Sequence, residues 1–298
     1  MSKARLLSPK QTWRLLKEAF QEWQQDKASR LAAALAYYTV FSLAPLLVLV
    51  IAIAGSVFGT DTARDQLVTQ IQALVGSSGA DVITDALENA NEPGANQGAI
   101  ASAISIAVLM FGASGVFIEL QNSLNTIWNI EPKPGQGVGS FVQKRLLSFS
   151  MILVIGFLLL VSLVLSTALA AFSGYLSQWI EGVGWILNTV ISLGLITFLF
   201  AAIFKYLPDA HIVWKDVIIG AFITTLLFTL GKYLLGLYLG NASVGSTYGA
   251  AGSLIALLAW IYYSAQILFF GAEFTQVYAR RFGSQIVPDK NAVVSSSK

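Results

Sequence analysis

The sequence predicts an all-α fold: a polytopic membrane bundle of about six transmembrane helices with an amphipathic N-terminal helix. The chain has 298 residues, of which 55% are hydrophobic and only 11% are charged. A typical soluble domain is about 25% charged, so much of the apolar surface must face lipid. Six apolar stretches reach the roughly 20 residues that cross a bilayer. They lie near 31–59, 98–118, 148–173, 183–204, 217–239 and 250–273.

Lysine and arginine are sorted to one side of this layout. With a cytoplasmic N-terminus, 16 of the 18 lie in cytoplasmic segments, Arg64 lies in an outer loop and Lys232 lies in a span. Cytoplasmic loops carry the excess of lysine and arginine in membrane proteins. We therefore expect a multi-pass protein of the inner (plasma) membrane with both termini in the cytoplasm.

Two cytoplasmic segments flank the transmembrane domain, which we place at 31–282. Residues 1–30 combine basic residues with apolar residues at helical spacing, namely Trp13, Leu16, Phe20 and Trp23. This pattern predicts a basic amphipathic helix along the membrane surface, with membrane lipids as partners. The anionic surface accounts for the basic residues, so no nucleic acid is expected. Residues 283–298 are polar and are expected to form a disordered tail.

The outer loop 60–97 is long and acidic. Leu67, Ile71, Leu74 and Val75 share one helical face, and a second short helix is expected around 82–87. One interpretation is a pair of interfacial helices that cap the bundle. The alternative is a gate or collector for cations at the outer face.

Lys232 is the clearest candidate for a functional residue, because a charge inside the membrane is costly. It lies seven residues before Leu239, about 10 Å below the outer boundary at 1.5 Å per residue. It could snorkel to that boundary, or it could face a cavity that holds an anionic lipid or small anionic substrate. The other substrate-pathway candidates are the mid-span residues Tyr262, Tyr263 and Gln266, and Pro45, which should kink the first span.

Polar residues gather at the inner ends of the spans. Arg30, Glu119, Arg145 and Glu273 share that depth and form a candidate inner charge cluster. It could fix helix packing, or it could act as an inner gate or proton-linked carboxylate pair. At the end of the second span, Gln121, Asn122 and Asn125 could bond neighbouring helices or line a pore mouth. Ala32–Ala36 and Gly112–Gly115 predict close helix approach.

Several kinds of chemistry find no support in the sequence. There is no cysteine and only one histidine, His211, so no zinc site of His and Cys can form within the chain. Phosphate-binding and dinucleotide-binding loops are absent. The cytoplasmic acids are scattered rather than clustered as metal-dependent nucleases require. We therefore expect no catalytic residue, no metal and no cofactor.

Four segments carry a resemblance to a known family. These segments are RLAAALAYYTVFSLAPLLVL, GVFIELQNSLNTIW, YLPDAHIVWKDVIIGAF and GSLIALLAWIYYSAQILFFGAEFTQVYA. Together they resemble the YihY/virulence factor BrkB family of bacterial inner-membrane proteins, over roughly 12–282. The resemblance implies a link to serum resistance and envelope lipid export. The family's label as ribonuclease BN is regarded as a mistaken gene assignment, and no catalytic residue carries over.

Three functions follow as hypotheses. The first is a transporter or flippase/exporter for an anionic or amphipathic envelope substrate, based on Lys232 and the polar mid-span groups. The second is a non-transporting structural or assembly factor for envelope integrity, which needs no intramembrane charge. The third and least favoured is a membrane-associated ribonuclease. An oligomer is compatible with all three.

Overall fold

The computed structural model describes residues 8–75, 84, 99–133, 183–241, 250–284 and 286–295. Within these ranges the chain forms helices and four short strands, joined by short turns and loops. The helices are α1 (Pro9–Gln25), α2 (Ala28–Phe58), α3 (Thr60–Val75), α5 (Ala99–Ile127), α7 (Val183–Tyr206), α8 (Trp214–Asn241) and α10 (Ala250–Phe282). The strands are β1 (Ile130–Pro132), β2 (Ala210–His211), β3 (Val287–Pro288) and β4 (Ala292–Val294).

The predicted membrane helix bundle is confirmed. Four helices in the described part of the chain are long and apolar enough to span a membrane, over 28–56, 189–206, 214–234 and 254–282. A fifth predicted span, 98–118, coincides with the first part of α5. The span expected at 148–173 lies outside the described residues, as does the short outer helix expected around 82–87. Helix α3, in the loop predicted to be on the outer side, is present and packs Leu67 against α2.

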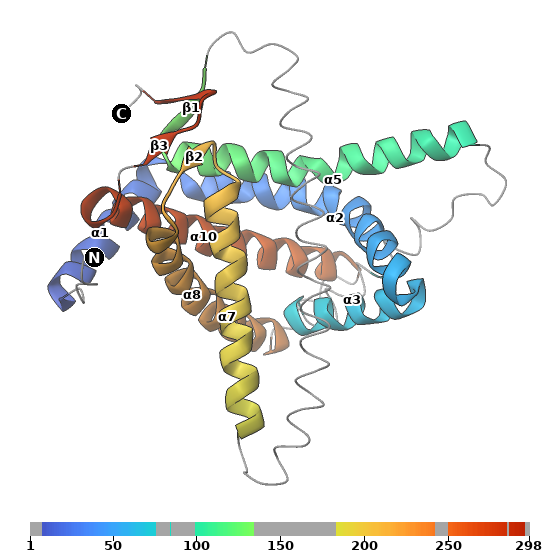
Figure 1. The fold of residues 1–298 in the computed structure, drawn as a ribbon. Coiled ribbons are helices and arrows are strands. Elements are labelled where there is room, and N and C mark those ends of the chain that lie inside the picture. The colour runs from blue at the N-terminus through green and yellow to red at the C-terminus, as the bar shows by residue number, and fades with distance from the viewer. Residues whose placement is uncertain are drawn as a thin grey trace.

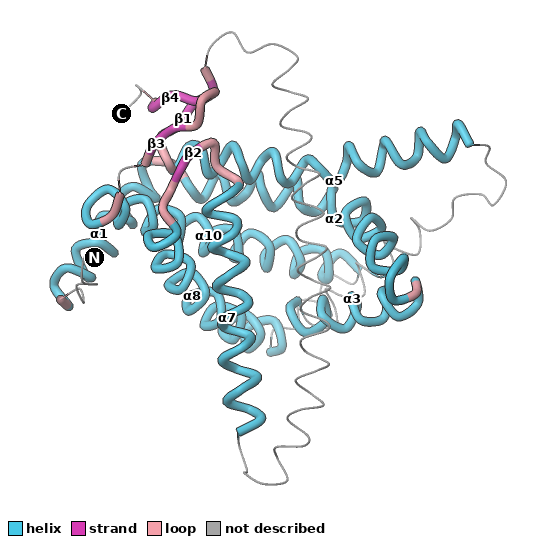
Figure 2. The backbone as a smooth tube through the Cα atoms, in the orientation of Figure 1, coloured by secondary structure: helices cyan, strands magenta, loops and turns pink. Residues whose placement is uncertain are grey.

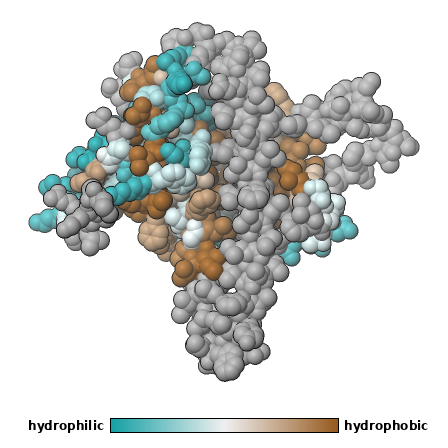
Figure 3. All heavy atoms as spheres, viewed as in Figure 1, coloured by the Kyte–Doolittle hydropathy of each residue, from teal (hydrophilic) through white to brown (hydrophobic). Residues whose placement is uncertain are grey.

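The helices meet at one end of the bundle, which we call the strand end because it carries β1–β4. Helices α5, α7 and α10 finish there, and α2 and α8 begin there. Figure 1 shows α5 and α7 converging at the strand end and separating as they run away from it. Figure 3 shows hydrophilic residues near the strand end, with hydrophobic residues between them.

The C-terminal tail corrects a prediction, because residues 286–295 are ordered rather than disordered. Strand β3 pairs antiparallel with β2, and β4 pairs antiparallel with β1 (Figure 2). The backbone N–H of Asp289 also donates to the carbonyl of Asp209 at 3.0 Å. Backbone pairing does not require apolar side chains, so a polar composition did not reveal these strands.

Helix α1 turns away from α2 at a single residue. Ser8 caps α1 with a capping box, and Lys27, between the helices, adopts a left-handed φ of 53°. That residue breaks the helical path, so α1 crosses the strand end in Figure 1 instead of extending α2. The predicted amphipathic helix is therefore a separate element, packed on α10.

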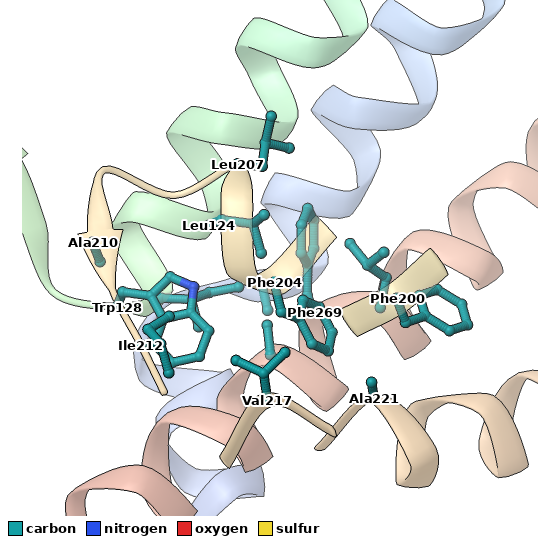
Figure 4. Packing of buried hydrophobic residues seen from close by; sticks show 14 of the residues in the cluster. Leu124, Trp128, Phe200, Phe204, Leu207, Ala210, Ile212, Val217, Ala221 and Phe269 are labelled. Atoms are coloured by element: carbon teal, nitrogen blue, oxygen red, sulfur yellow. The ribbon is translucent and has the colours of Figure 1, made fainter. Parts of the chain in front are cut away.

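The main core lies beside the strand end (Figure 4). Phe204 of α7, Phe269 of α10 and Leu124 of α5 are fully buried there. Trp128 and Ile212, which come just after α5 and just before α8, pack into the same cluster. The segments that follow α5 and precede α8 therefore pack directly against the helices.

Helix α2 approaches α5 closely where the first span carries its proline. A Cβ added at Gly112 would lie 3.2 Å from Cγ of Pro45. Ser42 Oγ donates to the carbonyl of Gly112 at 2.7 Å. The close approach predicted from Gly112–Gly115 is thus present, and Pro45 lies at this contact inside a helix that continues to Phe58.

Candidate functional site

A carboxylate clasp joins α5 to the connection between α7 and α8. Gln121 Nε2 donates to Oδ1 of Asp209 at 2.9 Å, and Asn125 Nδ2 donates to Oδ2 at 2.8 Å. The backbone N–H of Asp209 donates in return to Oδ1 of Asn125 at 2.8 Å. Both amides are about 95% buried, with Gln121 3% and Asn125 4% exposed. Asn122, the third polar residue predicted here, is exposed and takes no part.

Other polar contacts extend this clasp across the strand end. Lys205 Nζ donates to the carbonyl of Ile212, which closes the loop between α7 and α8. The sole histidine, His211, pairs through Nδ1 with Asp289 of the tail. In the sequence, Asp209 is only one of several scattered acids. Its acceptor role depends on α5, which lies 84 residues earlier in the chain.

A stretch near the end of α10, residues 271–277, is enclosed on all sides. Every residue from 271 to 277 is buried, and this stretch holds the GAEF segment of the family resemblance. Phe274 and Val277 face α1, while Gly271 and Thr275 face α8. A helix surrounded in this way is normally apolar all round. The polar residues within it, Glu273 above all, therefore stand out as candidates for a function.

Glu273 is fully buried, at 0% exposed. It lies seven residues after Gln266 and seven before Arg280, which places the three on one face of α10. Gln266 accepts a hydrogen bond from Ser29 Oγ of α2 at 3.5 Å. Arg280 pairs with Glu18 and Glu22 of α1 at 2.8 and 2.9 Å. Glu273 thus faces the junction of α1 and α2.

The predicted inner charge cluster is only partly brought together. Arg30 is exposed, Glu119 is half-buried and Arg145 lies outside the described residues. Two arginines of α10 instead pair with α1 at this end: Arg280 contacts Glu18, and Arg281 Nε lies 2.6 Å from Glu18 Oε2. The roles proposed for the four residues of the cluster stay predictions.

The substrate-pathway candidates lie on three different helices. Tyr262, Tyr263 and Gln266 are half-buried in α10, and Tyr263 lies against Gly231 of α8, where a Cβ would be 2.4 Å from its Cε1. Lys232 is exposed on the surface of α8. It therefore does not share an internal site with Tyr262 and Gln266. Pro45 belongs to the contact between α2 and α5.

Comparisons with known proteins match this chain to membrane proteins. A family model described as virulence factor BrkB matches residues 19–295. A UPF0761 membrane protein of Psychrobacter sp. is 26% identical over 89% of this chain and 48% of its own length. One from Albidiferax ferrireducens is 30% identical over 88% of this chain and 61% of its length. One from Alteromonas mediterranea is 26% identical over 85% of this chain and 83% of its length.

The chain spans about half the length of the Psychrobacter relative. No solved structure matches it.

Proposed function

We propose that this chain, which belongs to the virulence factor BrkB family, is an inner-membrane flippase or exporter for an anionic, amphipathic envelope lipid. One observation carries the proposal: Lys232 is an exposed cation on α8, a helix long and apolar enough to span a membrane. The same proposal places the strand end in the cytoplasm, because most of the described basic residues lie there.

The surroundings of Lys232 support a lipid-like substrate. Leu230, Tyr233 and Leu234 are 57%, 66% and 51% exposed, so the ammonium group lies on an apolar surface. A cation at such a depth is costly unless it meets an anion or reaches water. The anionic head of an amphipathic substrate supplies that counter-charge, while its tails remain in the lipid.

The arrangement of the helices is compatible with access from one side. The carboxylate clasp and the enclosed segment of α10 both lie at the strand end, where the helices converge. In an alternating-access carrier, this closed side would be the cytoplasmic one, and the substrate would enter from the other side of the membrane.

Lipid flipping in proteoliposomes tests the proposal. Purified protein should accelerate the movement of fluorescent phosphatidylglycerol between leaflets, measured by dithionite quenching. Lys232→Gln should slow this movement by about tenfold, the equivalent of losing about 1.4 kcal/mol of interaction. Lys232→Arg should retain most of the rate, because it keeps the charge.

Lys215→Gln is the matched control, since Lys215 is also an exposed lysine of α8 but lies in its first turn at the strand end. It should flip lipid at the wild-type rate. An unchanged rate in Lys232→Gln would remove Lys232 from the mechanism. Wild-type protein that moves no lipid would instead favour the second candidate, a structural factor for the envelope, which the tail locked by β1–β4 supports.

A further inference from the structure

Helix α1 is held on the bundle by one of its faces. Leu15 and Ala19 are 1% and 0% exposed, and they pack with Phe274 and Val277 of α10. This apolar contact fixes which side of α1 is turned away from the protein.

The acidic residues of α1 form ion pairs with α10, which leaves the outward side of α1 with positive charge. The only acids of α1 are Glu18 and Glu22. Glu18 contacts Arg280 at 2.8 Å and Arg281 at 2.6 Å, and Glu22 contacts Arg280 at 2.9 Å. These carboxylates therefore have their counter-charges within the protein, at the contact between the two helices.

The residues left outside are cations and aromatics. Lys10, Arg14 and Lys17 are exposed. Trp13 is 70% exposed and Phe20 is 48% exposed, although both are large and apolar. The outward face of α1 thus carries three positive charges and two aromatic rings, with no acid exposed on it.

We infer that this face of α1 docks on the anionic phospholipid headgroups of the leaflet at the strand end. Trp13 and Phe20 enter the boundary between headgroups and acyl chains, and the three cations bind lipid phosphates. The orientation of α1 fits this role, because it crosses the end of the bundle (Figure 1). The inference does not depend on whether the protein transports lipid.

Site-specific fluorescence tests the inference in the 298-residue chain, which has no cysteine of its own. A polarity-sensitive dye is attached at Gln24→Cys and, as a matched control, at Gln25→Cys. Both positions are exposed on α1, and consecutive helical residues point about 100° apart. Gln24 follows Phe20 by one turn and lies on the side of the two aromatic rings, whereas Gln25 lies more than about 100° around the helix from both rings.

In nanodiscs that contain phosphatidylglycerol, the dye at position 24 should emit at shorter wavelength than in pure phosphatidylcholine, and the dye at position 25 should shift less. The triple variant Lys10→Gln/Arg14→Gln/Lys17→Gln should abolish this difference, while Lys215→Gln/Lys290→Gln should preserve it. Equal emission in both lipids, or an unchanged difference in the triple variant, would overturn the inference. A response to added RNA in place of lipid would do so as well.

Discussion

Replacing Gly220 by alanine should destabilise the protein by about 2–3 kcal/mol, as overpacking of a tight contact does. Helices α8 and α10 meet through a reciprocal pair of glycine–threonine contacts. A Cβ at Gly220 would lie 1.6 Å from Thr275 Oγ1 and 2.7 Å from its Cβ. Rotation of the threonine cannot move its Cβ, so the helices must separate. The same holds at Gly271, where a Cβ would lie 1.8 Å from Thr224 Oγ1.

The measurement is the unfolding free energy in detergent, followed by tryptophan fluorescence. Gly194→Ala on α7 is the control, because an added Cβ meets nothing within 4 Å there; it should be neutral or slightly stabilising. Combining Gly220→Ala with Thr275→Gly should recover much of the loss, because it removes the side chain that the new Cβ meets. Equal stability of the Gly220 and Gly194 variants would refute the close packing of α8 on α10.

Removing the side chain of Asn125 should cost about 2–4 kcal/mol of stability. Asn125→Ala deletes a donor to Asp209 Oδ2 and the acceptor of the Asp209 backbone N–H. Loss of a hydrogen-bond partner costs about 1–3 kcal/mol for a buried group, and water can replace part of it at Asp209, which is half-buried. Gln121→Ala should cost less, because it removes only the bond to Oδ1.

Asn122→Ala tests whether the effect belongs to the clasp or to asparagines of this helix in general. Asn122 lies in the same helix but is exposed, so its replacement should change stability by less than about 0.5 kcal/mol. Thermal unfolding of the three variants side by side gives the comparison. A loss in Asn122→Ala as large as in Asn125→Ala would contradict the proposed importance of Asp209.

The helices could be predicted from the sequence because lipid imposes a minimum apolar length on every span. Their ends could not: α5 continues to Ile127 and α10 to Phe282, beyond the predicted limits of 118 and 273. Past the apolar stretch, both helices are held by packing and polar contacts at the strand end. Apolar length carries no information about those contacts.

The candidate site was predicted less completely. Gln121 and Asn125 were identified as polar residues at a helix end, but their acceptor, Asp209, required the folded arrangement of α5 and α7. Lys232 was recognised as an intramembrane charge, whereas its exposure on α8 depends on how that helix is turned. The pairing of Glu18 with two arginines of α10 joins the two ends of the chain, and local pattern could not reveal it.

The account depends most on the strand end being cytoplasmic and α3 being on the other side of the membrane. Single cysteines at Thr62→Cys and Lys290→Cys, both at exposed positions, can be labelled in spheroplasts with a membrane-impermeant maleimide. The account predicts that position 62 reacts in intact spheroplasts and that position 290 reacts only after permeabilisation. Labelling of both from the same side, or the reverse pattern, would contradict it.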